Sequence, residues 1–190
     1  MPCFIVGLSY LLGSLPTAYI AGRLTKGKDI RHMGDGNVGA GNAFHQLGAR
    51  VGIAVGIIDA LKGVLAIVIA QAAGVSQTTV LLAGLAAVVG HNWPVFLGFR
   101  GGRGEATTIG VLLSLVTLPM LILAAPMLAT LLIWKKVPLA STVLFLPLLL
   151  LCWWFGFSGL LVSYSIALPC LVGVTHFLRT RHKLAHHAGG

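Results

Sequence analysis

The sequence has few charged residues and very few acidic ones. Only 9% of its 190 residues are Asp, Glu, Lys or Arg, just four of these are acidic, and 57% of the chain is hydrophobic. A soluble domain carries about a quarter of its residues as charged side chains. The mean hydropathy of +0.94 and the long apolar runs 78–89 and 137–154 predict an integral membrane protein.

Two further patterns are missing. No segment alternates apolar and polar residues with the period of a β-strand, which argues against a membrane β-barrel. The three cysteines, Cys3, Cys152 and Cys170, are scattered through apolar segments without paired spacing, so we expect them to be packing residues. Of the seven histidines, His45, His91 and His176 come from three different segments without a local ligand motif, and His186 and His187 lie in the tail, so no metal site is expected.

A helix needs about 20 residues to cross a bilayer, and the chain has room for about seven such helices. We therefore expect an all-α polytopic membrane protein, with one domain over residues 1–184 and a short His/Gly tail at 185–190. The expected spans are 3–22, 51–73, 78–97, 106–121, 121–134, 138–155 and 157–178. The segments around Pro119 and Pro126 can also form one broken helix.

Basic residues concentrate at one set of the expected helix ends. They occupy the loop 23–50, the segment 100–103, positions 135–136 and the tail, whereas the loops near 73–77, 119 and 156 have none. Since Lys and Arg favour cytoplasmic loops, the N-terminus is expected outside and the C-terminus in the cytoplasm. The first span has no basic segment before it and no clean cleavage site, and is expected to be retained. The net charge of +9 is then mainly a topology signal, and nucleic acid is not an expected partner.

Two glycine-rich loops interrupt the apolar sequence on this basic, cytoplasmic side. The first reads HMGDGNVGAGNAFHQLG at 32–48, and the second reads GHNWPVFLGFRGGRGEAT at 90–107. Glycine permits positive φ and close backbone approach, so that N–H groups can converge on an anion. Arg103 can add a charge-assisted contact to phosphate. One such loop is as readily an interfacial turn, but two on one face favour a shared phosphate site.

The span 51–73 contains two oppositely charged residues. Asp59 and Lys62 lie three positions apart, on one face of a helix, where an ion pair forms. Charged groups within a span are costly and are usually functional. The pair therefore either joins this span to its neighbours or brings Lys62 to a substrate.

Five motifs follow one another in an order that resembles a known family. They are GSLPTAYI, KGKDIRHMGDGNVGAGNAFHQLG, DALKG, GHNWPVFLGFRGGRGEAT and PLAST, and the likeness covers about residues 13–176. The order is similar to that of the bacterial membrane acyl-phosphate:glycerol-3-phosphate acyltransferases of the PlsY type. The resemblance implies a seven-span enzyme of the bacterial inner membrane.

Such an enzyme moves a fatty acyl group from acyl phosphate to the 1-hydroxyl of glycerol 3-phosphate. The products are lysophosphatidic acid and phosphate, in the first step of phospholipid synthesis. The resemblance implies these two small-molecule substrates and membrane lipids as partners, with no cofactor, no coenzyme A and no metal. The sequence does not indicate the oligomeric state or the acyl-chain length.

The family positions carry over residue by residue onto this chain. The expected catalytic residues are Asp35, His45, Ser141 and His176. The expected substrate-binding residues are Gly34, Gly36, Asn37, Gly39, Asn42, Lys62, His91, Gly101, Gly102, Arg103, Gly104 and Arg179.

The chain departs from the family pattern at several of these positions. Asp35 stands where the family has serine, His45 where it has arginine, and Arg103 where it has lysine. Glu105 replaces an apolar residue, and Arg179 replaces asparagine. A carboxylate 4 Å from a phosphate costs about 4 kcal/mol at an effective dielectric near 20, so a compensating group or a different ligand is required.

Three hypotheses follow. In the first, Asp35 is neutralised by Arg179, Arg31 or His45, and the substrate remains glycerol 3-phosphate. In the second, an Asp35–His45 pair serves as the base for a less charged acceptor. In the third, the protein is non-catalytic or transports an anion through glycine-broken helices. The absence of an inverted repeat argues against the third.

Overall fold

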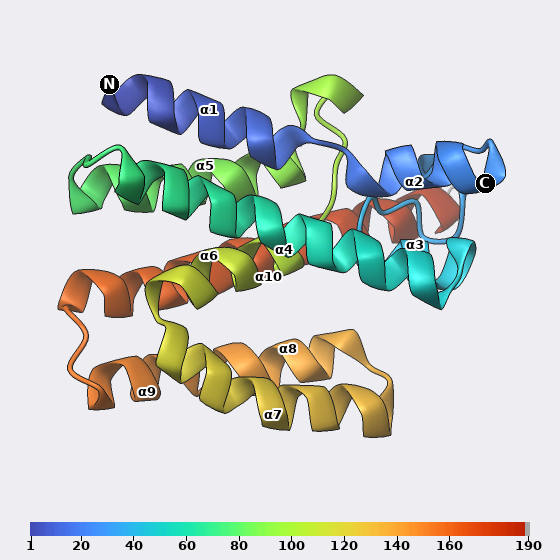
Figure 1. Ribbon diagram of the computed structural model, residues 1–190. Coiled ribbons are helices and arrows are strands. Elements are labelled where there is room, and N and C mark those ends of the chain that lie inside the picture. The colour runs from blue at the N-terminus through green and yellow to red at the C-terminus, as the bar shows by residue number, and fades with distance from the viewer. Residues whose placement is uncertain (189–190) are drawn as a thin grey trace.

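The computed structural model describes the backbone of residues 1–188 and the side chains of residues 1–180, and its regular elements are all helical (Figure 1). The α-helices are α1 (Pro2–Ser14), α2 (Thr17–Lys26), α3 (Ala40–Leu47), α4 (Ala49–Ala72), α5 (Gln77–Asn92), α6 (Glu105–Leu115), α7 (Thr117–Trp134), α8 (Val137–Phe145), α9 (Leu148–Trp154) and α10 (Gly159–Ala188). Two short 3-10 helices, η1 (Ile30–His32) and η2 (Val95–Leu97), lie within the two loops. The expected all-α membrane fold is confirmed.

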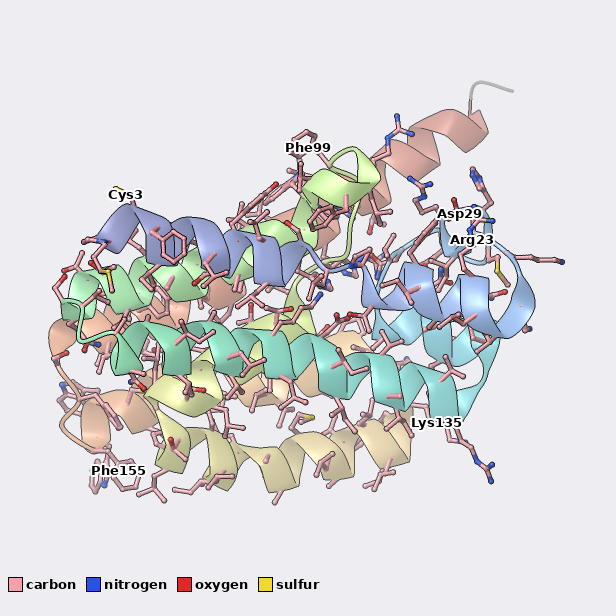
Figure 2. The ribbon with its side chains drawn as sticks, turned by 45° about the horizontal axis from the view of Figure 1, so that its top comes forward. Cys3, Arg23, Asp29, Phe99, Lys135 and Phe155 are labelled. Carbon is pink, nitrogen blue, oxygen red and sulfur yellow. The ribbon has the colours of Figure 1, made fainter. Side chains whose placement is uncertain are left out.

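The helices run roughly side by side between two ends of the molecule. Figure 2 shows Cys3 and Phe155 at one end, and Arg23, Asp29 and Lys135 at the other. The N-terminus lies at the first end and α10 finishes at the second (Figure 1). Two of the basic loops therefore share an end of the bundle, as the charge pattern predicted.

Glycines let the central helices approach closely. A Cβ atom on Gly110 of α6 would lie 1.9 Å from the carbonyl oxygen of Ala60 on α4, and one on Gly63 would lie 2.3 Å from that of Thr107. Gly13 of α1 meets the Ala87 carbonyl oxygen of α5 in the same way, at 2.0 Å. Small residues at helix interfaces are typical of membrane proteins, where packing rather than water drives association. The outer surface keeps large apolar side chains such as Ile53 and Ile57 exposed, as a lipid-facing surface requires.

The span boundaries differ from the expected ones at the prolines. The first span is two helices, α1 and α2, separated at Leu15 and Pro16, and the span 138–155 is interrupted at Pro147 between α8 and α9. Proline interrupts a helix because it has no N–H to donate and its ring crowds the preceding turn. The boundary between α6 and α7 falls at Val116 rather than at 121, which places Pro119 in the first turn of α7.

In the part of the chain that the structure describes, six helical segments are long and apolar enough to cross a membrane, and α6 is shorter. α6 has 11 residues, fewer than the roughly 20 that a complete span needs. It starts only at Glu105, after residues 93–104 of the second glycine-rich loop, so these residues are not available to extend it to a full span.

Two other segments differ from the sequence-based expectation. Residues 40–47 of the first glycine-rich loop form α3 rather than irregular backbone, with Gly39 as its N-cap. The segment expected as a tail from 185 begins as a continuation of α10, and its side chains lie outside the described residues.

We predict that Gly110→Ala destabilises the fold and that Gly7→Ala does not. The new methyl group at 110 would overlap a carbonyl oxygen of α4, whereas no atom lies within 4 Å of a Cβ at position 7 of α1. Overpacking costs about 1–3 kcal/mol or more. The melting temperature of the purified variants in detergent measures the difference, and equal values for the two variants would contradict this account of the α4–α6 contact.

Candidate active site

A cleft of about 920 Å³ opens between the two glycine-rich loops and the last helix. Its walls are dominated by positive charge, since four arginines and a single carboxylate line it. The lining residues are Arg31, His32, Asp35, Gly36, Asn37, Trp93, Phe99, Arg100, Gly101, Arg103 and Arg179. The expected meeting of the two loops at one site is therefore what the structure shows.

The first loop is fixed by the side chain of Asn42, which lies at the start of α3. Its amide nitrogen donates to the carbonyl oxygens of Ile30, Met33 and Asn37, at 3.0–3.3 Å, and its Oδ1 accepts the N–H of Asp35 at 3.3 Å. A Cβ on Gly34 would lie 2.4 Å from that same Oδ1. Gly34 and Gly36 both have positive φ, at 54° and 66°. The turn that presents Asp35 to the cleft thus requires glycine on each side.

The carboxylate of Asp35 is held at two points. Its Oδ1 accepts the N–H of Asn37 at 3.0 Å, and its Oδ2 lies 3.0 Å from Nη2 of Arg103. This ion pair joins the first loop to the second across 68 positions of sequence. The side chains of Asp35 and Arg103 remain 43% and 24% exposed, so that both can still reach a ligand.

The second loop is folded against α5 and α10. The N–H groups of Gly101 and Gly102 donate to the carbonyl oxygens of Asn92 and His91, at 3.2 and 3.0 Å. The guanidinium of Arg179 donates to the carbonyl oxygens of Gly101 and Asn92. Since these carbonyls lie beyond the helical hydrogen bonds of α5, Arg179 satisfies backbone groups that the bilayer would leave unpaired.

A buried group of charges lies beneath the cleft. Lys62 Nζ contacts Asp59 Oδ1 at 2.8 Å and donates to the carbonyl oxygens of Leu15 and Gly13, at 2.8 and 3.1 Å. His91 Nδ1 lies 3.7 Å from the same Asp59 oxygen. All three N–H donors of an ammonium are then used within the protein. Lys62 closes the break between α1 and α2 instead of extending into the cleft.

Comparison with known proteins identifies the family. The sequence profile described as glycerol-3-phosphate acyltransferase matches residues 3–187. The chain is 55% identical to glycerol-3-phosphate acyltransferase 4 of Dehalococcoides mccartyi over 181 residues, which cover 95% of this chain and 98% of the relative. It is 39% identical to the glycerol-3-phosphate acyltransferase of Halalkalibacterium halodurans, over 93% of this chain and 86% of that one. This chain belongs to the glycerol-3-phosphate acyltransferase family.

Solved structures of the family have the same fold. The crystal structure of PlsY (YgiH), an integral membrane glycerol 3-phosphate acyltransferase, in its glycerol 3-phosphate form, matches with a TM-score of 0.85 and 33% identity. The match covers 97% of this chain and 92% of that one. The lysophosphatidic acid form matches with a TM-score of 0.79. The chain is thus an acyltransferase with the fold of an integral, multi-pass membrane protein.

Several residues expected at the acyltransferase site do not line the cleft. His45 lies exposed on α3, where its ring contacts Phe44, and Asp35 pairs with Arg103 rather than with it. Ser141 of α8 donates to the carboxylate of Glu105 at the start of α6. His176 is half-buried on α10, within electrostatic range of Arg103 and Asp35. The Asp35–His45 pair of the second hypothesis is not formed, and the partner of Asp35 is none of the three residues that the first one named.

The remaining expected residues either line the cleft or support the loops that form it. Gly36, Asn37, Gly101, Arg103 and Arg179 line the cleft directly. Gly34, Gly39 and Asn42 shape the first loop from behind. Gly102 and Gly104 make room for α5, since a Cβ would lie 1.9 Å from His91 Nε2 at 102 and 2.5 Å from Asn92 Oδ1 at 104.

Four further cleft residues lie within the family motifs 26–48 and 90–107 but were not assigned to the site from the sequence. They are Arg31, His32, Trp93 and Arg100, and Phe99 of the second loop lines the cleft beside them. The sequence did contain an indication of the two arginines, because a basic residue immediately before a glycine-rich turn can reach the ligand that the turn binds.

Arg31 is itself paired with an acidic residue. Asp29 accepts hydrogen bonds from the guanidinium of Arg31 at 2.7–3.1 Å, and this contact lowers the pKa of the Asp29 carboxyl to about 2.

The described side chains contain no group of three or more His, Cys, Asp or Glu residues placed to hold a metal ion. The expectation that the site has no metal stays a prediction.

We predict that Lys62→Met lowers stability through the loss of a buried charge partner. The substitution leaves the Asp59 carboxylate unpaired and removes the donor from two carbonyl oxygens at the α1–α2 break. Breaking a buried ion pair costs about 3–5 kcal/mol. Melting curves in detergent compare it with Lys136→Met, a matched change on an exposed side chain.

In the double variant Lys62→Met with Asp59→Asn, both charges are gone, and we expect it to be more stable than Lys62→Met alone. If the double variant is the less stable of the two, the stabilising contact is not the ion pair.

Proposed function

We propose that this enzyme transfers a fatty acyl group from acyl phosphate to the 1-hydroxyl of glycerol 3-phosphate, giving lysophosphatidic acid and inorganic phosphate. The single observation that supports this assignment is the arginine-lined cleft at the meeting point of the two loops. Donor and acceptor each carry a phosphate group, and a site for both needs several cationic donors close together. The glycerol 3-phosphate and lysophosphatidic acid forms of the related PlsY structures agree with it.

The arginines of the cleft are not equally available. Arg31 is engaged by Asp29, and Arg179 by backbone carbonyls. Arg103 has one carboxylate contact, and Arg100 is exposed at the cleft. We assign Arg103 and Arg100 to the phosphate groups of the substrates, whereas Arg31 and Arg179 hold the loops in place and add to the positive potential.

The reaction needs little chemistry from the protein because acyl phosphate is already activated. The acceptor oxygen forms a bond to the carbonyl carbon, the bond from that carbon to the phosphate oxygen breaks, and the hydroxyl proton leaves with the departing phosphate. Positioning the reactants and stabilising the developing negative charge then supply the acceleration. The guanidinium of Arg103 stabilises the charge that builds on the leaving phosphate.

Ser141 and His176 belong to the same proposal as residues near the donor. Ser141 is linked through Glu105 to the loop that carries Arg103, and His176 faces the same charges from α10. In this proposal the two polar groups, on α8 and α10, lie beside the path by which the acyl chain of the donor reaches the cleft.

The pairing of Asp35 with an arginine supports glycerol 3-phosphate as the acceptor. A carboxylate that is neutralised by Arg103 leaves the cleft net positive, because Arg31 is paired with Asp29 while Arg100 and Arg179 face no other acid among the described lining residues. An acceptor without a phosphate would have no negative group to bind to this positive charge.

The assay uses purified protein in lipid, with acyl phosphate and either glycerol 3-phosphate or glycerol, and follows phosphate release. We expect release that depends on glycerol 3-phosphate. Release only with glycerol would indicate the less charged acceptor, and no release with either would indicate a non-catalytic or transport protein. Arg103→Ala should lower turnover by about 100-fold or more, the typical cost of removing a group that stabilises developing charge. Arg50→Ala, an exposed residue at the start of α4, serves as the control, and a normal rate in Arg103→Ala would remove Arg103 from the site.

We further propose that the N-terminus lies outside the bacterial inner membrane, and that the cleft and the C-terminus face the cytoplasm. The placement of Lys135 and Arg23 at the end of the bundle opposite Cys3 supports this orientation (Figure 2).

Single cysteines at positions 136 and 156, in a chain whose three native cysteines are replaced by alanine, test the orientation. We expect a membrane-impermeant maleimide to label position 156 in intact spheroplasts, and position 136 only after permeabilisation. The reverse pattern would invert the proposed orientation.

A further inference from the structure

The cleft contains one negative group among its lining residues, and this group occupies the place of a ligand. Asp35 Oδ2 lies 3.0 Å from Arg103 Nη2, while Oδ1 accepts a backbone N–H from Asn37. A guanidinium and a loop N–H together are the donors that bind a phosphate oxygen pair. The carboxylate therefore accepts hydrogen bonds from the guanidinium and the loop N–H that could otherwise bind a substrate phosphate.

The guanidinium edge of Arg103 is only half used by this contact. Nη2 bonds to Asp35, whereas the neighbouring Nε is buried without a hydrogen-bond partner among the described residues. Nε and Nη2 lie on one edge of the guanidinium and can bind two oxygens of one anion at once. The carboxylate, with its other oxygen held by Asn37, does not fill both positions, but a phosphate can.

The carboxylate can leave without any change in the loop. The backbone around Asp35 is held by Asn42, and the side chain itself is 43% exposed. A rotation about the side-chain bonds of Asp35 breaks its contacts with Arg103 and with the Asn37 N–H, and such rotations in exposed residues are fast. The loop therefore keeps its shape whether the carboxylate or a phosphate occupies the guanidinium.

We infer that Asp35 is an internal substitute for phosphate, which pairs with Arg103 in the empty enzyme and must be displaced by the phosphate of a substrate or product. Asp35 thus sets how tightly the site holds phosphate. It weakens binding of the phosphorylated substrate, and it favours departure of the inorganic phosphate that the reaction releases. This inference rests on the proposed function for its role in turnover, but its effect on phosphate affinity stands independently.

The test measures binding of inorganic phosphate alone, by titration calorimetry of the purified protein in detergent, together with KM for glycerol 3-phosphate. Asp35→Asn keeps an oxygen for the Asn37 N–H and removes the charge. We expect it to lower the dissociation constant of phosphate and the KM by about fivefold or more, because the lost ion pair no longer competes. Asp35→Ser should change both in the same direction, and Asp35→Glu, which keeps the charge, should stay near the original values.

A second variant tests whether the increase in phosphate affinity depends on Arg103. In the Arg103→Ala background, Asp35→Asn should give less than a twofold change in phosphate affinity. An equal gain with and without Arg103, or an unchanged or weaker affinity in both Asp35→Asn and Asp35→Ser, would overturn the inference. If the unaltered enzyme gives no turnover with acyl phosphate and glycerol 3-phosphate, the proposed function fails instead, and the phosphate titrations still decide the role of Asp35.

Discussion

The architecture depends on satisfying backbone groups where helices break inside the membrane. α1 ends at Ser14, before a full span is complete, and the carbonyl oxygens of Gly13 and Leu15 accept N–H groups from the side chain of Lys62. An unpaired carbonyl in the bilayer costs several kcal/mol, so an ammonium at this point stabilises a break that the lipid would otherwise forbid. Asp59 then balances the buried ammonium. The ion pair in the middle of an apolar helix is therefore a consequence of the broken first span.

The same constraint governs the second loop. Residues 93–104, between α5 and the short helix α6, are irregular backbone apart from η2, and side chains of other segments support them. The guanidinium of Arg179 reaches the carbonyls of Gly101 and Asn92 from α10, and the hydroxyl of Tyr10 donates to the carbonyl of Trp93. Gly102 leaves room for the His91 ring, which in turn lies beside Asp59. Because Asp59 is adjacent to both Lys62 and His91, one buried carboxylate is shared by the support of the α1–α2 break and the support of the second loop.

The sequence predicted much of this fold, and the reasons for its failures are physical. Apolar length predicted the all-α membrane fold with about seven helices, of which six described segments are long enough to cross a membrane, and the bias of basic residues predicted the end at which the loops gather. The sequence did not predict that α6 is short, because an apolar segment has the same mean hydropathy whether it crosses the whole bilayer or half of it. It also missed α3, since residues 40–47 follow a glycine-rich turn and mix small, polar and aromatic side chains. Helix formation there is stabilised by packing on α4, where Gly52 admits Phe44.

The candidate site was predicted in its motifs but not in its pairings. The glycine pattern and Arg103 identified both walls of the cleft, whereas Arg31 and Arg100 lie within the same family motifs but were not assigned to the site from the sequence. The partner of Asp35 could not be read from the sequence, because the distance between residues 35 and 103 is set by how α2, α3 and α5 pack. No local periodicity carries that information.

The two departures from the family pattern at Asp35 and Arg103 are explained best as a pair. A lysine at 103 would be a point charge with three rotatable donors, and a carboxylate opposite it would neutralise most of what it offers to a phosphate. An arginine has a rigid fork, so that one N–H can hold the carboxylate while the neighbouring Nε remains buried and unpaired, and both N–H groups can bind an anion that displaces the carboxylate. The structure shows this division, with Nη2 on Asp35 and Nε unpaired. Arginine at 103 thus makes an aspartate at 35 compatible with a site for phosphate.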